Sequence, residues 1–420
     1  MAHNRTTDLI VFGAGPAGLS ATVAARSRGI RVMLIEVGPR VDARSRYQAA
    51  HLASGVGGAG LYSDGKFSYW PSASALWTLP DQTRLRRSYS WFGTTTQGLI
   101  KPPPFPRHTG TQHAVSALTQ KHYASEKTTF EARQHLIRTL QEELAASLVP
   151  EAAVRQIALE GPGVVALVET SAGVTEIEAR GAILAGGRFG GLQPQGVLNN
   201  IPTVFRRYEF GLRIVSTAQD FPFRVSSDID PKLLLRADDE EWRTFCTIRE
   251  GEVSETDFFG LVSYSGRADV APTHFSNFGF NLRISKQPEP GSPIEDAARR
   301  VLDGRVQTFQ AGVPEYMAGR VAGYGSIIDE KLRDGLERLL PYLGESGDDM
   351  VVIGPCIEGI GDYPLIDANL KVPGSPVWVA GDQTGLFRGL TAAFVSGHYV
   401  GDLAGESFLN ATTSNSRAQP

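Results

Sequence analysis

Cysteine is nearly absent from this sequence, which has only Cys246 and Cys356 among its 420 residues. Two cysteines so far apart exclude a disulfide framework, a C-x-x-C redox pair and a cysteine-ligated iron–sulfur cluster. The eight histidines show no ligand spacing with carboxylates or cysteines, so no metal site is predicted. Any electron carrier must therefore come from elsewhere.

Long apolar runs and a strong excess of one charge are also missing. No stretch approaches about 18 consecutive apolar residues, so no membrane-spanning helix is predicted. The net charge is only -4, which argues against nucleic acid as a partner. The polar residues 1–8 lack the apolar core of a signal peptide, and a soluble cytoplasmic protein is expected. The length and the 41% hydrophobic content favour two globular domains, and the oligomeric state is not specified.

The first motif is a glycine-rich turn between a predicted strand and a predicted helix. Residues 8–12 form an apolar run, residues 17–29 read as an alanine-rich helix, and residues 31–36 read as a second buried strand. The turn between them has the G-x-G-x-x-G spacing, and its residues are Gly13, Gly15, Pro16, Ala17 and Gly18. This order of elements is typical of a βαβ dinucleotide-binding unit.

Each part of this unit has a chemical reason. The first glycine permits a tight turn, the second lets the backbone approach a pyrophosphate, and the third allows close helix packing. The N-terminus of the helix offers partial positive charge to the phosphates. Glu36 ends the second strand, where its carboxylate can accept hydrogen bonds from both hydroxyls of an adenosine ribose. These residues leave FAD and NAD both open.

The C-terminal part favours FAD. Residues 377–380 read as a core strand, Gly381 and Asp382 follow it, and residues 391–405 read as a helix. The segment resembles the strand-Gly-Asp-helix motif of the glutathione-reductase-type flavoproteins. The resemblance implies that Asp382 binds the ribityl-phosphate region and that the helix points its N-terminus at the pyrimidine end of the flavin. The cofactor-binding candidates here are Gly381, Asp382, Gly389, Leu390 and Thr391.

Other segments sharpen the resemblance. Gly186 and Gly187 resemble the point at which these flavoproteins return to the nucleotide domain after a β-meander. Residues 57–66, 211–214, 244–246 and 276–278 are similar, in order, to a bacterial family of FAD-dependent dehydrogenases, with a departure at residues 248–250. The resemblance implies that a glycine-rich loop passes near the flavin, with Gly58, Gly60 and Ser63 as cofactor-binding candidates.

The expected fold is α/β. It combines a Rossmann-like FAD-binding domain, a three-layer ββα arrangement with a β-meander, with a β-rich substrate domain. We expect the FAD-binding domain at residues 1–95, 151–204 and 331–408, a helical connector insertion at 96–150, the substrate domain at 205–330, and a disordered tail at 409–420.

Four residues are candidates for catalysis. Lys66 could bind a water or stabilise the anionic reduced flavin, the alternative being a solvated lysine after a turn. Arg213 and Arg388 could each bind a substrate carboxylate, the alternative being internal ion pairs. His274, like Tyr62, has a side chain that can transfer protons. Asp64 equally fits a turn cap and Cys246 a core position.

The predicted function is that of an FAD-dependent oxidoreductase of dehydrogenase or oxidase type, with hydride transfer between a small organic metabolite and flavin N5. No second G-x-G-x-x-G follows a strand, so a dedicated NAD(P)H domain is not expected. One alternative is a flavin monooxygenase that binds NAD(P)H transiently and acts on a small aromatic or cyclic metabolite. A second alternative is a binding module without catalysis, as in the prenyl-protein escort factors that resemble these enzymes.

Overall fold

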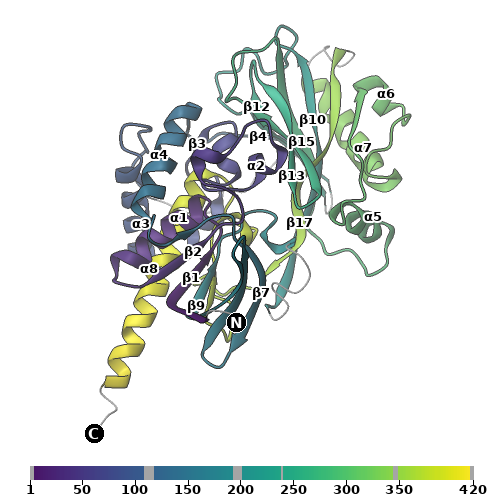
Figure 1. Ribbon diagram of the computed structural model, residues 1–420. Coiled ribbons are helices and arrows are strands. Elements are labelled where there is room, and N and C mark those ends of the chain that lie inside the picture. Colours follow the sequence, from purple (N-terminus) through teal and green to yellow (C-terminus); the bar gives the residue numbers. More distant parts are fainter. Residues whose placement is uncertain (1–3, 108–117, 193–200, 238–239, 344–348, 417–420) are drawn as a thin grey trace.

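The computed structural model describes residues 4–107, 118–192, 201–237, 240–343 and 349–416. Two seven-stranded sheets organise these residues, and each sheet has its own set of covering helices (Figure 1). The sheet whose strands come from the N-terminal and C-terminal parts of the chain forms the first domain. The other sheet, built mainly from the middle of the chain, forms the second domain.

The first domain starts with the predicted βαβ unit. Strand β1 (Asn4–Phe12) pairs in parallel with β2 (Val32–Ile35), and helix α1 (Pro16–Ser27) connects them. The order across the sheet is β6-β2-β1-β9-β8-β7, with β18 also paired to β9. The remaining strands are β6 (Leu148–Val149), β7 (Ala153–Glu160), β8 (Gly163–Thr170), β9 (Gly173–Leu184) and β18 (Val377–Val379). Strands β7, β8 and β9 form the predicted antiparallel meander.

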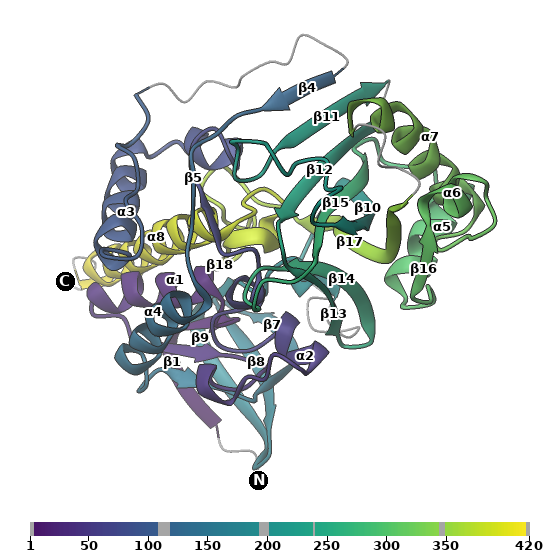
Figure 2. The same ribbon diagram turned by 90° about the horizontal axis from the view of Figure 1, so that it is seen from above.

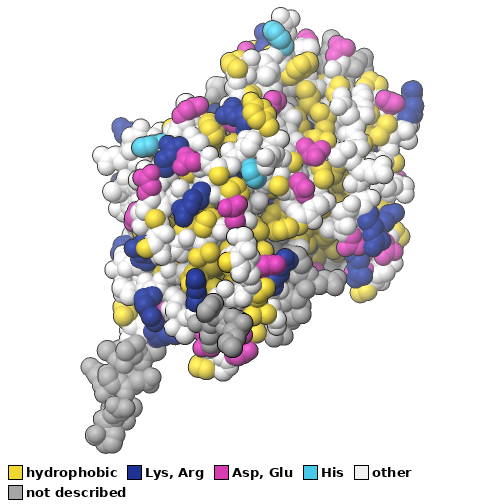
Figure 3. All heavy atoms as spheres, viewed as in Figure 1, with side chains coloured by type: hydrophobic (Ala, Val, Ile, Leu, Met, Phe, Trp, Pro, Cys, Tyr) yellow, Lys and Arg dark blue, Asp and Glu magenta, His cyan; other side chains and the backbone are white. Residues whose placement is uncertain are grey.

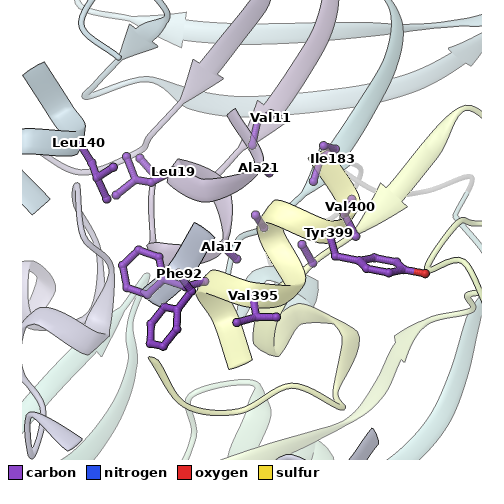
Figure 4. Packing of buried hydrophobic residues seen from close by; sticks show 14 of the residues in the cluster. Val11, Ala17, Leu19, Ala21, Phe92, Leu140, Ile183, Val395, Tyr399 and Val400 are labelled. Atoms are coloured by element: carbon purple, nitrogen blue, oxygen red, sulfur yellow. The ribbon is translucent and has the colours of Figure 1, made fainter. Parts of the chain in front are cut away.

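Helix α8 (Leu390–Ser416) packs closely on α1 (Figure 4). This contact places the C-terminal part of the cofactor-binding domain against its N-terminal part. Gly397 and Gly401 of α8 lie against the backbone of Ala17 and Ala21, where an added Cβ atom would overlap a carbonyl oxygen of α1. Helices α3 (Gln82–Thr95) and α4 (Phe130–Glu143) complete this apolar core. Small residues on both helices therefore set the spacing between the first and last parts of the cofactor-binding domain.

The second domain is a sheet whose outer face is covered by helices. Its order is β16-β17-β10-β15-β12-β11-β4, and helices α5 (Pro293–Leu302), α6 (Val313–Met317) and α7 (Ser326–Leu343) cover its outer face (Figure 2). The strands are β4 (Leu118–Lys121), β10 (Thr203–Thr217), β11 (Lys232–Ala237), β12 (Glu240–Ile248), β15 (Phe275–Ile284), β16 (Phe309–Gly312) and β17 (Val351–Pro364).

Smaller elements connect the domains. The hairpin of β13 (Glu252–Phe258) and β14 (Leu261–Arg267) lies near β17 and reaches α2 (Ala49–Ala53) of the first domain. Strands β3 (Lys66–Ser68) and β5 (Ser125–Lys127) form a separate two-stranded sheet. Charged side chains of both signs are interspersed over the face seen in Figure 3. Among the described residues, no helix has the length and apolar character needed to cross a bilayer.

The predicted fold class is confirmed, while several boundaries differ from those expected. Residues 118–149, expected within a connector insertion, supply β4 to the second sheet and β6 to the first. Helix α7 and strand β17 belong to the second domain, because their apolar side chains pack in its core. The first domain thus resumes after Pro364. Helix α8 continues to Ser416 where a disordered tail was expected, since a formed helix propagates through weak helix formers; residues 417–420 lie outside the described residues.

Candidate functional site

The turn between β1 and α1 is a cradle made of backbone. Gly13 has φ +99°, and a Cβ atom there would lie 2.5 Å from the carbonyl oxygen of Ala185. At Gly18 a Cβ atom would overlap the carbonyl oxygen of Gly13. Space remains over Gly15, where the nearest atom to an added Cβ is the Cα of Gly58 at 3.7 Å. The N-terminus of α1 therefore presents N–H groups at a place that a phosphate can approach.

The glycine-rich loop 57–63 lies directly beside this turn. The amide of Gly57 donates to the carbonyl of Ala14 at 2.8 Å, and a Cβ atom at Gly58 would lie 3.1 Å from the Cα of Gly15. Farther along, Gly60 lies against the side chain of Leu390 at the start of α8. The hydroxyl of Ser63 donates to the carbonyl of Gly60 at 2.8 Å. The fold thus brings together three predicted cofactor-binding segments.

Two buried arginines, which were not among the predicted site residues, bind the backbone carbonyls of this loop. Arg44 donates to the carbonyls of Val56 and Gly58, each at 2.9 Å, and Arg133 donates to the carbonyl of Leu61 at 3.0 Å. Burial lowers the pKa of Arg44 to about 10. No local motif marks these residues, because their partners are carbonyl oxygens reached only through the fold.

Glu36 connects the turn after β1 to the segment before the glycine-rich loop through hydrogen bonds. Its Oε2 accepts a hydrogen bond from the amide of Ala14 at 2.7 Å, and its Oε1 accepts from the amides of Gly38 and Gly55 at 2.9 Å. Among the described residues Oε2 has one hydrogen-bond partner, so it retains an acceptor position. The predicted contact of Glu36 with ribose hydroxyls remains a prediction.

The C-terminal motif meets the start of α1. Gly381 has φ +65°, and a Cβ atom there would lie 2.8 Å from the Cβ of Ala17. Asp382 Oδ1 and Thr391 Oγ1 are buried without a hydrogen-bond partner among the described residues. A buried acceptor and a buried hydroxyl need polar partners, which the hydroxyl-bearing chain of FAD supplies. The amide of Gly186, from the end of the meander, donates to Gln383 at 2.6 Å. The residues present therefore fit FAD.

A cluster of arginines and carboxylates lies next to Asp382. Arg388 Nη1 donates to Glu209 at 2.9 Å and to Glu358 at 2.7 Å, while its Nε donates to Asp382 at 3.3 Å. Arg188 donates to Glu358 at 2.6 Å. Arg388 is thus paired internally, the alternative considered for it above. The carboxylates outweigh burial and hold the pKa of Arg388 well above its usual value.

Glu209 is the centre of this arginine cluster. Its side chain is fully buried and pairs with four arginines, which are Arg207, Arg243, Arg283 and Arg388. These cations outweigh burial and hold the pKa of Glu209 well below its usual value. With Arg188 included, five guanidinium groups face four carboxylates, those of Glu209, Glu241, Glu358 and Asp382. The cluster carries an excess of positive charge.

Lys66 belongs to a second buried network. Its ammonium group lies 3.3 Å from Asp64 and pairs with Asp230, to which Tyr123 also donates at 3.2 Å. Burial opposes the charge of Lys66, but Asp64 and Asp230 outweigh it and hold its pKa well above the usual value. Lys66 is thus a buried cation paired with two carboxylates, and its catalytic role remains a prediction. The solvated surface position considered for it is wrong, because only 11% of the side chain is exposed.

Two further candidates, Arg213 and Tyr62, are buried and form hydrogen bonds within the protein. Arg213 is 1% exposed, and its Nη2 donates to Asn277 and to the carbonyl of Cys246. Tyr62 is buried and donates to the carbonyl of Arg44 at 3.2 Å.

His274 lies apart from these residues. Its side chain is exposed, and its carbonyl accepts from Ala218, just beyond the end of β10. Arg207, near the other end of β10, contacts Gly385; the strand between them spans about 33 Å at roughly 3.3 Å per residue. His274 is therefore far from the end of β10 that contacts Gly385, and its role in catalysis remains a prediction. Sequence reasoning selected it only because its side chain can transfer protons.

Sequence reasoning missed Glu209, Asn277 and Asn281. A usable signal was present on β10, where Glu209 and Arg213 alternate with the buried apolar residues Phe210, Leu212 and Ile214. A strand with an apolar face and a charged, buried face indicates a polar site. No group of three or more potential metal ligands occurs in the described part of the chain.

Comparison with known proteins supports the cofactor. The family model of an FAD-binding domain matches residues 8–63, which confirms the predicted FAD-binding domain and FAD as its cofactor. No curated protein sequence matches the chain.

Three solved structures illustrate distant similarities. An anhydrotetracycline hydroxylase from Streptomyces rimosus is 13% identical with a TM-score of 0.45, over 96% of this chain and 63% of that one. A flavoprotein/dehydrogenase from Cytophaga hutchinsonii is 15% identical with a TM-score of 0.41, over 97% and 79% of the two chains. A geranylgeranyl bacteriochlorophyll reductase-like protein from Thermoplasma acidophilum is 14% identical with a TM-score of 0.41, over 97% and 80%. This chain thus spans less than two thirds of the hydroxylase.

Proposed function

We propose that this FAD-dependent oxidoreductase acts directly on a small organic metabolite, as a dehydrogenase or oxidase, by hydride transfer at flavin N5. When bound, FAD supplies the redox chemistry, and the chain supplies position, charge and exclusion of water. The observation that carries this proposal is the arginine cluster around Glu209, which contacts Asp382 of the cofactor motif.

The cofactor-binding residues divide by the part of FAD that each would hold. The turn residues Gly13, Gly15, Pro16, Ala17 and Gly18 would hold the pyrophosphate, and Glu36 the adenosine ribose. Asp382 and Thr391 would bind the polar chain of the cofactor through the two unpartnered oxygens. The remaining segments would line the cofactor with backbone, and their residues are Gly58, Gly60, Ser63, Gly186, Gly187, Gly381, Gly389 and Leu390.

The charge of the arginine cluster favours a cofactor that accepts electrons from a substrate. Electrons received by FAD add negative charge, and cations beside it make that charge less costly in a buried setting. Arg188 and Arg388 contact Asp382, at 3.7 Å and 3.3 Å. Their carboxylate partners fix them in place, so the charge is organised before a ligand binds.

The absorption spectrum of the purified protein, followed by anaerobic titration with NADPH, tests the proposal. We expect the yellow spectrum of a flavoprotein and slow or no bleaching by NADPH, because the sequence has no second dinucleotide motif. Rapid bleaching by NADPH would instead favour a monooxygenase with transient NADPH binding. A colourless protein that cannot be reconstituted with FAD would overturn the proposal and favour a binding module.

A further inference from the structure

The second sheet has a buried polar face opposite its helices. This face, called the polar face below, is defined by the register of three neighbouring strands. Its residues are Glu209, Gly211 and Arg213 of β10, Asn277, Gly279, Asn281 and Arg283 of β15, and Glu241, Arg243 and Phe245 of β12. The intervening residues of β10 and β15 pack instead in the apolar core with α5, α6 and α7.

Three hydrogen-bond donors on the polar face lack an acceptor. Asn277 Oδ1 accepts from Arg213, and Asn281 Oδ1 accepts from Arg243 Nε at 3.1 Å, so each amide presents its Nδ2 as the remaining donor. Both Nδ2 atoms and Arg213 Nε are buried without a partner among the described residues. Buried polar groups are normally hydrogen-bonded, and three unpaired donors on one face call for a ligand rich in acceptors.

The charge of Arg213 points to an anion. In the described parts of the chain, no carboxylate lies within ion-pair distance of Arg213, whereas Arg243 and Arg283 on the same face both pair with Glu209. Its recorded hydrogen-bond partners are two neutral oxygens, from Cys246 and Asn277. Burial lowers the pKa of Arg213. A buried guanidinium without a counter-ion is costly, and an anionic ligand removes that cost.

The polar face also carries a buried aromatic ring, that of Phe245. Gly279 has no side chain, and the ring of Phe245 occupies the space that a Cβ atom there would take. Arg213 Cζ lies 6.0 Å from the centroid of this ring. A β-bulge follows Phe245, where the pairing with β15 shifts and Cys246 has φ +47°. Bulges and residues with strained backbone often mark functional sites, because they redirect side chains.

From these observations we infer that the polar face binds the carboxylate group of an aromatic or cyclic substrate, with Arg213, Asn277 and Asn281 as its hydrogen-bond donors. The inference rests on the proposed function, because it assumes that this face meets the cofactor. Arg213 supplies the charge, the two amides supply direction, and Phe245 offers a ring against which a planar body can pack.

Benzoate is the probe that tests this inference, with benzamide as its neutral isostere. Titration of the holoenzyme by calorimetry, together with the visible spectrum of the flavin, measures binding. We expect benzoate to bind at least tenfold more tightly than benzamide and to perturb the spectrum. Arg213→Met removes the charge and should weaken benzoate binding at least tenfold. Arg299→Met, an exposed arginine on α5 paired with Glu295, is the matched control and should leave binding unchanged.

A second variant keeps the test valid if Arg213→Met does not fold. Asn277→Asp keeps the size of the side chain and places a carboxylate against Arg213, so it should also abolish the preference for benzoate. Equal binding of benzoate and benzamide by the wild type, or unchanged benzoate binding in folded Arg213→Met and Asn277→Asp, would overturn the inference. A colourless protein that still binds benzoate by calorimetry would refute the proposed function while upholding this site.

Discussion

The cradle around Gly15 and the polar face of the second sheet bury polar chemistry by opposite means. The cradle uses backbone groups from Gly13, Gly18 and the loop 57–63, which pack closely because side chains are absent and leave space over Gly15. The polar face uses long charged side chains, with Glu209 at the centre of four arginines. We therefore expect the cradle to lose FAD when volume is added to it. We expect the polar face to lose stability when a charge is removed from it.

Gly18→Ala should have the largest effect, because the cradle cannot accept a methyl group. The added Cβ atom would overlap the carbonyl oxygen of Gly13, and backbone cannot move aside as a flexible side chain does. We expect complete loss of bound FAD and a loss of more than about 3 kcal/mol in the free energy of unfolding. Absorbance at the flavin band and thermal unfolding measure both quantities.

Gly93→Ala is the matched control for this variant. Gly93 lies within α3, with nothing within 4 Å of an added Cβ atom. Alanine there should raise the stability by roughly 0.5 to 1 kcal/mol, because it restricts the unfolded chain and favours helix. FAD should stay bound. If Gly18→Ala also retained FAD, the cradle would not be the binding site.

Glu209→Gln should cause the next largest loss, through charge alone. Glutamine keeps the shape of the side chain and leaves four arginines without their common counter-ion. Removing one partner of a buried ionic cluster is expected to cost about 3 kcal/mol of stability. Urea unfolding measures it, and Glu169→Gln, in an exposed pair with Arg155, should show no measurable change. Equal stability of the two variants would mean that the cluster is not a stabilising unit.

The same contrast explains what the sequence revealed. The cradle was predictable because Gly13, Gly15 and Gly18 are contiguous and follow a strand, and because Gly381 and Asp382 repeat that logic near the end. These are local patterns with a backbone cause.

The polar face was not predictable in this way, because its residues come from strands far apart in the sequence. Arg388 was singled out, but its partners Glu209 and Glu358 come from β10 and β17 of the other domain. Whether an arginine is free or paired depends on such neighbours. Asn277 was part of a family-like segment, and only the register of β15 with β10 placed it beside Arg213.

Asp382→Ala should have a smaller effect, confined to the cofactor. Its unpartnered Oδ1 is the acceptor proposed for FAD, and losing a charged acceptor typically weakens binding about tenfold to hundredfold. Titration of the apoprotein with FAD, followed by quenching of flavin fluorescence, measures the dissociation constant. Asp8→Ala, which removes the pair between Asp8 of β1 and Arg31 just before β2, should leave that constant unchanged. Unchanged affinity in Asp382→Ala would show that the C-terminal motif does not hold FAD.

The smallest effect should be a dependence of stability and FAD binding on pH. It should arise from the first domain, which contains the cradle, and not from the polar face. His398 of α8 stacks on Trp91 of α3, and burial lowers its pKa to about 4, with Arg87 adding to this and Asp402 opposing it. The unfolded chain, with the ordinary value of 6.5, binds more protons between these values, so stability is complete above pH 6.5 and falls below it. At pH 5 we expect a loss of about 1 to 2 kcal/mol and partial release of FAD, measured by flavin fluorescence. His398→Gln cannot be protonated and should release no more FAD at pH 5 than at pH 7. Identical release profiles for the wild type and this variant would place the acid-sensitive group elsewhere.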